Sequence, residues 1–180
     1  MITLHTLGDA VIKVGDREVR PTSPIMFAAL LYLGVERGQR VPRAALQELL
    51  FPKAGERSGA HSLRQLLYKL RQLGAPIQAD GDVVSLPADA VTDDYSANGN
   101  GAGPHAHARF LDIYAPRVSD AFDEWLDRKR AQIGAGLRRN LAAQMAARRE
   151  VSDWASVERI AHEILAGDAF NDEATYALAE

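Results

Sequence analysis

Cysteine is absent from the 180 residues of this chain. Its absence excludes a disulfide framework, a zinc site with thiolate ligands and a thiol nucleophile, and it is typical of proteins in a reducing cytoplasm. Residues 1–16 have no basic segment followed by an apolar one, so we expect no signal peptide and a cytoplasmic location. The longest apolar run, residues 25–35, contains Gly34 and is too short to cross a bilayer, so no membrane partner is expected.

Catalytic motifs are missing as well. The chain has no Gly-rich phosphate loop followed by Lys and Ser or Thr, no nucleophile elbow and no His-Glu-x-x-His. It has two carboxylate pairs, Asp93-Asp94 and Asp123-Glu124, but such pairs are common on solvated loops and at helix N-termini. His105 and His107 are half a metal site at most. We therefore expect a protein that is not an enzyme, with neither cofactor nor metal.

Acidic residues are also missing from residues 57–79, although the whole chain has a net charge of −3. Residues 1–86 contain 11 Lys and Arg against 8 Asp and Glu, whereas residues 87–180 contain 10 against 16. Residues 37–71 alone carry eight basic and two acidic side chains. A basic block beside an acidic one indicates a polyanion-binding module joined to a second unit.

The first half of the chain predicts short strands followed by helices. Apolar residues alternate around two Gly-Asp turns within residues 2–19, which predicts three antiparallel strands. Helices are expected at about 24–36, 43–51 and 58–73, the first apolar almost all round and therefore central in the core. An Asp-Gly turn within residues 77–86 predicts a hairpin. Three helices followed by a hairpin describe a winged helix-turn-helix.

The stretch 57–73 is the most informative. Read as a helix capped by Ser58, it places leucines on one side and only groups that reach phosphates and base edges on the other. We expect it to enter the major groove of double-stranded DNA, with Arg64 and Gln65 reading bases because both bond bidentately to purine edges. A solvated cationic helix is the alternative, and Tyr68 could pack beneath the helix or reach a phosphate. The expected DNA-binding residues are Arg57, Ser58, His61, Ser62, Arg64, Gln65, Tyr68, Lys69 and Arg71.

The second half predicts a linker and then helices. Residues 89–108, rich in Ala, Asp, Asn, Gly and His, are expected to form a linker or long loop. From Phe110 onward apolar residues recur mostly four apart, which predicts a long amphipathic helix ending near residue 150. Further helices are expected at about 154–165, after a Ser152 cap, and from about residue 171.

The tryptophans and two of the glycines in these predicted helices lead to further expectations. Trp125 and Trp154 are interpreted as core anchors rather than as platforms that stack ligands. Gly134 and Gly136 lower the helix propensity by about 1 kcal/mol each, and they let a neighbouring group approach closely.

Short motifs stand in a characteristic order along the chain. In the first half they are Leu4-x-x-Leu7-Gly8, Phe27-Ala28-Ala29-Leu30-Leu31-Tyr32-Leu33, Val41-Pro42-Arg43-x-x-Leu46, Leu49-Leu50-Phe51-Pro52 and Ser62-Leu63-Arg64-Gln65. These resemble the OmpR/PhoB-type winged helix. In the second half they are Phe110-Leu111, Phe122-x-x-Trp125-Leu126-x-x-x-Arg130 and Leu165-x-x-Asp168. These resemble the bacterial transcriptional activator domain, so the whole chain resembles the SARP group of regulators.

The resemblance implies an α+β winged helix-turn-helix followed by an all-α, tetratricopeptide-like helical domain. Residues 1–88 would be the DNA-binding domain, 89–108 the linker and 109–180 the activator domain. The family usually has Trp where Phe51 stands and often Pro where Ala169 stands. Because the match ends inside an expected helix, we expect the chain to be truncated at its C-terminus.

In function, the resemblance implies a sequence-specific transcription regulator that activates by contacting RNA polymerase. Lys53, in the loop before the basic helix, would touch polymerase or DNA, and homodimers would bind direct repeats. The competing hypothesis is a protein-interaction module whose winged helix no longer binds DNA. A small-molecule sensor in the helical half is a third alternative, for which the sequence identifies no polar anchor.

Overall fold

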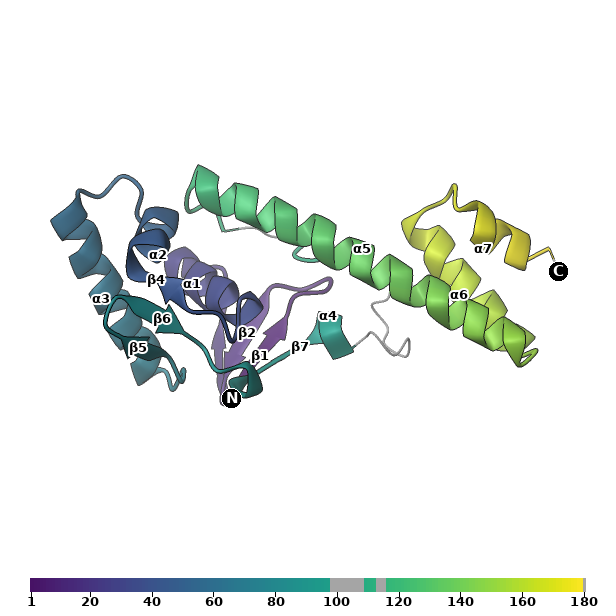
Figure 1. Cartoon of the computed structure of the whole chain (residues 1–180), viewed down its shortest axis with the longest axis horizontal. Helices are drawn as coiled ribbons and strands as arrows, with labels where there is room; N and C mark the ends of the chain where they lie inside the picture. The colour runs from purple at the N-terminus through teal and green to yellow at the C-terminus, as the bar shows by residue number, and fades with distance from the viewer. Residues whose placement is uncertain (98–108, 113–115, 180) are drawn as a thin grey trace.

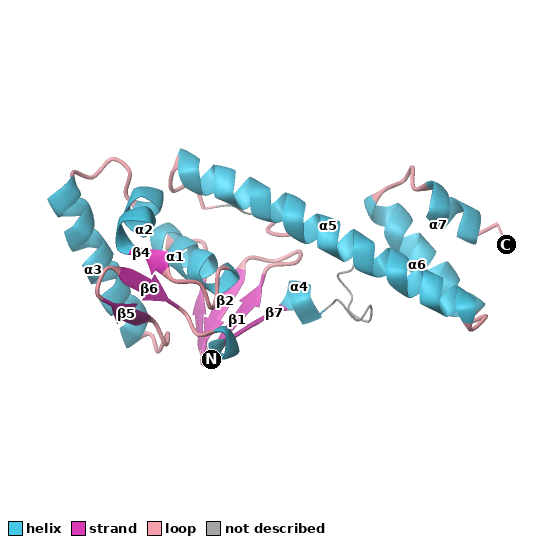
Figure 2. Cartoon of the chain, viewed as in Figure 1, coloured by secondary structure: helices cyan, strands magenta, loops and turns pink. Residues whose placement is uncertain are grey.

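The computed structural model describes residues 1–97, 109–112 and 116–179, and it shows an α+β chain with an N-terminal sheet region and a helical C-terminal region (Figures 1 and 2). The strands are β1 (Ile2–His5), β2 (Val11–Val14), β3 (Arg17–Val19), β4 (Val41–Pro42), β5 (Gln78–Asp80), β6 (Val83–Ser85) and β7 (Val91–Asp93). The helices are α1 (Pro24–Val35), α2 (Arg43–Leu50), α3 (Glu56–Gln72), α4 (Asp94–Ala97), α5 (Asp120–Glu150), α6 (Trp154–Gly167) and α7 (Asp172–Ala177), with a 3₁₀ turn at Ala88–Ala90.

Two small sheets frame the N-terminal region. The first has the order β3-β2-β1-β7, with the three N-terminal strands antiparallel and β7 parallel to β1. The second has the order β4-β6-β5 and is antiparallel throughout. The predicted N-terminal strands and the predicted hairpin are confirmed, and residues Val41–Pro42 before α2 form a strand that pairs with β6.

Helix α1 is the centre of the first core, as its composition predicts. Five consecutive residues, Phe27 to Leu31, are fully buried, which requires neighbours on every side of the helix. The side chain of Leu4 on β1 lies so close to Gly34 that a Cβ there would come within 3.2 Å of it. Because Gly34 has no side chain, α1 can pack directly against β1 of the first sheet.

The segment 88–97 corrects the expected linker, because part of it belongs to the first sheet. Strand β7 pairs with β1 in the register Ile2 with Val91 and Leu4 with Asp93. Only residues 98–108 of the expected linker, with His105 and His107, lie outside the described residues. The strand could not be predicted from the sequence, because the segment has few apolar residues. Its hydrogen-bonding partner, β1, lies some ninety positions earlier in the chain.

The Asp93-Asp94 pair holds this segment in place. Asp94 accepts hydrogen bonds from the backbone N–H groups of Thr6 and Leu7, at 2.7 and 2.8 Å, and from the Thr6 hydroxyl. Asp93 is buried and forms an ion pair with Arg37 at 2.6 Å. Both carboxylates are thus engaged in structural contacts that secure the edge of the sheet.

Helix α5 joins two hydrophobic clusters. Its N-terminal half supplies Phe122, Trp125 and Leu126 to the first core, whereas Leu141 and Met145 pack with α6 and α7 in a second cluster. Figure 1 shows the helix running from the sheet region to the far end of the molecule, where α6 and α7 lie. At 1.5 Å per residue its 31 residues span about 46 Å. The first core therefore extends beyond the boundary expected at residue 108.

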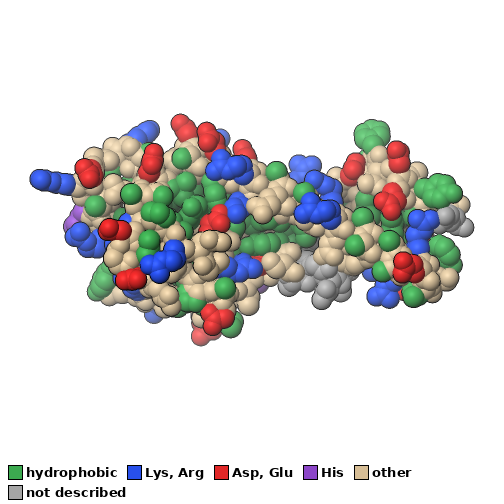
Figure 3. All heavy atoms as spheres, viewed as in Figure 1, with side chains coloured by type: hydrophobic (Ala, Val, Ile, Leu, Met, Phe, Trp, Pro, Cys, Tyr) green, Lys and Arg blue, Asp and Glu red, His purple; other side chains and the backbone are tan. Residues whose placement is uncertain are grey.

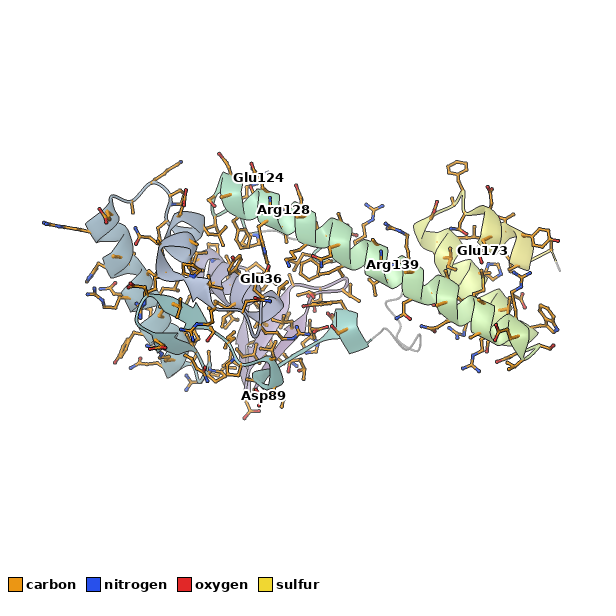
Figure 4. All side chains as sticks on the ribbon, viewed as in Figure 1. Glu36, Asp89, Glu124, Arg128, Arg139 and Glu173 are labelled. Carbon is orange, nitrogen blue, oxygen red and sulfur yellow. The ribbon has the colours of Figure 1, made fainter. Side chains whose placement is uncertain are left out.

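The contact between α5 and α1 combines apolar and polar groups. The Trp125 ring lies 4.9 Å from that of Tyr32, and its indole N–H donates to Glu36 Oε1 at 2.8 Å. Lys129 forms an ion pair with the same carboxylate oxygen at 2.8 Å. Figure 4 shows Glu36 on the side of α1 that faces α5. Burial and the neighbouring Glu36 carboxylate raise the pKa of the Tyr32 hydroxyl, which therefore stays protonated at neutral pH.

Three expectations for the C-terminal half are wrong in detail. Phe110 is not helical: it bridges to Leu7, and the N–H of Leu111 donates to Thr6. Asp153, not Ser152, caps α6, because its carboxylate accepts the N–H of Ser156. Trp154, at the first turn of α6, is 51 % exposed and is no core anchor. The helices predicted near 154 and 171 are confirmed.

Gly136 offers a test of helix propensity in α5. Among the described residues, no heavy atom lies within 4 Å of a Cβ built on Gly136. Replacing it with alanine should therefore raise the free energy of unfolding by about 1 kcal/mol, because alanine restricts the unfolded chain more than glycine does. Urea unfolding followed by circular dichroism measures the change. A loss of stability would contradict the regular helical geometry at this position.

Within the part of the chain that the structure describes, no helix combines the length and the apolar character that spanning a bilayer requires.

Candidate nucleic-acid interface

Helix α3 has one buried and one exposed face. Leu63, Leu66, Leu67 and Leu70 are at most 5 % exposed, and they pack on the first core as the spacing predicts. The helix begins at Glu56 with Gly55 as its N-cap residue. The predicted cap at Ser58 is therefore wrong, and the serine lies within the first turn of the helix.

The polar residues expected to bind DNA share the exposed face of α3. Eight of the nine are exposed, and Ser62 is intermediate. Tyr68 is 60 % exposed, so of its two expected placements the one beneath the helix is excluded. Figure 3 shows Lys and Arg side chains, with a His, projecting at the end of the molecule where α3 lies.

The exposed side chains differ in how far they are engaged within the protein. Gln65 is hydrogen-bonded to His61 at 2.8 Å, and Gln72 donates to the Tyr68 hydroxyl at 2.6 Å. Arg71 donates through Nε to the carbonyl of Ile77 at 3.1 Å. In contrast, no described residue forms a hydrogen bond or ion pair with the side chains of three cations on this face. They are Arg57, Arg64 and Lys69.

The β5–β6 hairpin lies beside α3 and is anchored by two arginines. Arg43 at the start of α2 donates through Nε to the carbonyl of Gly81 at 2.9 Å, and Arg40 forms an ion pair with Asp80 at 3.4 Å. The hairpin turn also carries the exposed Asp82. The tip is therefore not cationic, and the positive charge of this end of the molecule is concentrated on α3.

Arg17 on β3 extends the cationic surface and was missed in the sequence. It lines an open groove of about 570 Å³ together with Lys69, Gln72, Leu73 and Met26. Arg17 is exposed and has no described hydrogen-bond or ion-pair partner. No signal in the sequence could have placed it there, because only the packing of α3 against the N-terminal sheet brings residues 17 and 69 together.

Lys53 occupies the turn between α2 and α3 and is exposed. The two helices that flank this turn pack closely. A Cβ on Gly59 would lie 2.5 Å from Nε2 of Gln47, which donates to the carbonyl of Glu56. Lys53 is thereby presented to solvent next to the N-terminus of α3.

Two other kinds of site were considered in the sequence: a metal site and the carboxylate pair Asp123-Glu124. No group of three or more His, Cys, Asp or Glu side chains is arranged to hold a metal ion within the described ranges. Of the second carboxylate pair, Asp123 lies in the first turn of α5, where the helix dipole favours negative charge.

Comparison with known proteins returned no match: no family model, no curated protein and no solved structure resembles the chain closely enough to be recognised.

Proposed function

We propose that the chain is a sequence-specific DNA-binding transcription regulator built on a winged helix-turn-helix. The observation that carries the proposal is α3: a buried leucine face and an exposed face with cations that have no partner among the described residues. The order α1, β4, α2, α3, β5, β6 supports it, with α2 and α3 as the helix-turn-helix and the β5–β6 hairpin as the wing. Docking α3 in a major groove would give these guanidinium and ammonium groups anionic partners.

The roles of the side chains follow from their chemistry. Arg64 and Gln65 read base edges, Arg favouring guanine and Gln adenine. His61 and Tyr68 contact bases or adjacent phosphates. The remaining groups contact the DNA backbone and set the register of the helix in the groove: Arg57, Ser58, Ser62, Lys69 and Arg71. Arg71 keeps its Nε on Ile77, so its terminal nitrogens are the ones free to reach a phosphate.

In this proposal the C-terminal helices form a tetratricopeptide-like activator unit of the SARP type. The antiparallel packing of α5, α6 and α7 around a shared apolar cluster supports it. Lys53 and the turn around it would contact RNA polymerase or DNA, and two molecules would bind direct repeats. The long α5 would keep the two ends of the molecule at a set distance.

A salt titration with random double-stranded DNA tests DNA binding. If Arg57, Arg64 and Lys69 displace counterions from about three phosphates, the slope of log affinity against log salt should be about −2.7. A fourfold rise in salt should then weaken binding about 40-fold. Fluorescence anisotropy measures this, and selection of bound sequences from a random library then identifies the operator. Absence of binding at low salt would overturn the proposal.

A second candidate function is a protein-interaction module, which the far end of the molecule favours. Trp154 on α6 is 51 % exposed, Phe170 in the loop between α6 and α7 is 93 % exposed, and Tyr176 on α7 is 64 % exposed. Exposed aromatic residues are typical of protein interfaces. The same titration separates the two functions, because only the DNA-binding regulator should show a steep dependence on salt.

A further inference from the structure

A cavity of about 510 Å³ lies where α5 leaves the first core and meets α6. Its apolar walls are Phe110, Leu137, Leu141 and Ile164, and two glycines, Gly134 and Gly167, leave room in it. The volume is within the range of sites for small organic molecules, and the location between two packed units is a usual one for such sites.

Glu163 on α6 is the first polar group of the cavity. Its Oε1 forms an ion pair with Arg159 at 2.7 Å, whereas its Oε2 is buried and has no hydrogen-bond partner among the described residues. A buried hydrogen-bond acceptor without a donor lowers the stability of the protein, and such groups are rare in native structures. Glu163 is among the residues that line the cavity, so a donor bound there can satisfy this oxygen.

Guanidinium groups are the second polar feature. Arg130 is fully engaged, since it donates to the carbonyls of Phe110 and Leu111 and pairs with Asp127, so it forms a fixed wall. Arg138 has no hydrogen-bond or ion-pair partner among the described residues. Its Nη1 lies 3.5 Å from the position of a Cβ on Gly134, so it stands directly over the glycine. A guanidinium and a carboxylate oxygen without partners among the described residues thus line the same cavity, whose wall also includes Arg109, Asp112 and Asp168.

We infer that the cavity binds a small molecule that carries both an amine and a carboxylate on an apolar body, the chemistry of an apolar amino acid. The amine donates to Glu163 Oε2, the carboxylate accepts from Arg138, and the apolar body packs on the leucines and Phe110. Because Phe110 belongs to the first core and Ile164 to the second cluster, a bound molecule joins the two. Occupancy therefore stabilises the junction along α5.

Isothermal titration calorimetry with L-phenylalanine tests the inference on the full chain without DNA, so its result does not depend on the proposed function. L-phenylalanine should bind and raise the Tm. Phenethylamine, which lacks the carboxylate, and 3-phenylpropionate, which lacks the amine, should each bind at least about tenfold more weakly. Equal affinity for all three would overturn the assigned polar contacts, and no binding by any of them would overturn the site.

Two glycines of α5 supply matched variants. Gly134→Leu fills the cavity and should abolish binding, whereas Gly136→Leu makes the same change in the same helix, and Gly136 does not line the cavity. Glu163→Gln keeps the shape of the side chain but removes its charge, and it should weaken L-phenylalanine at least about tenfold. Circular dichroism checks that each variant is folded. Equal loss in both glycine variants, or no loss in Glu163→Gln, would contradict the inference.

Discussion

Replacing Trp125 with alanine should lower the free energy of unfolding by about 3–5 kcal/mol. The indole is only 5 % exposed and lies between the rings of Tyr32 and Phe122, with centroids at 4.9 and 5.2 Å. The substitution leaves a cavity among these rings and removes the hydrogen bond to Glu36. The loss falls on the contact that attaches α5 to the first core.

Trp154→Ala is the matched control for this prediction. It removes the chain's other tryptophan from a position that is 51 % exposed, so it should change the free energy of unfolding by less than about 1 kcal/mol. Urea unfolding followed by circular dichroism compares the two variants. Tryptophan fluorescence of the Trp154→Ala protein then reports the surroundings of Trp125 alone. Similar losses in both variants would show that α5 is not anchored through Trp125.

Arg64→Ala should weaken binding to the cognate DNA site by about 1–3 kcal/mol, which is roughly 5- to 150-fold. The side chain is exposed near the middle of α3 and has no described partner, so no internal contact competes with a base. Its neighbour Gln65 already shares a hydrogen bond with His61. A bidentate contact to guanine also discriminates between bases, so the variant should lose sequence preference at one position of the site.

Lys69→Ala is the control for Arg64→Ala. As a phosphate contact, Lys69 should contribute equally to cognate and random DNA, and its loss should reduce the salt slope by about 1. Anisotropy titrations with both DNA types at several salt concentrations distinguish the two roles. If Arg64→Ala weakened cognate and random DNA by the same factor, Arg64 would be a phosphate contact and base reading would fall to other residues.

Much of the local structure could be predicted because it depends on neighbours in the chain. The apolar spacing of α3 places its leucines inward and its cations outward, and the structure has both faces as expected. The start of the helix could not be predicted from Ser58. The helix begins instead at Glu56, after Gly55, and α2 approaches it closely at Gly59.

The errors share a physical cause. Strand β7 has too few apolar residues to show a pattern, and it forms because β1 offers an edge with unpaired backbone groups. Phe110 lies in an apolar helical pattern, yet it leaves the helix because Leu7 pairs with it and Leu111 adopts a φ of 50°. Trp154 is exposed because it is the first residue of α6, where no neighbouring helix covers it.

The sequence by itself determined the order of the elements from β1 to β6, the central position of α1 and the two faces of α3, because periodicity and turn residues act over a few positions. Only the tertiary structure decided that α5 joins the first core and that a cavity opens beside it. The indole of Trp125 meets a carboxylate 89 positions earlier in the chain, and Glu163 meets the cavity through the packing of α6 on α5. Such contacts depend on how packed elements exclude water together, which local pattern does not encode.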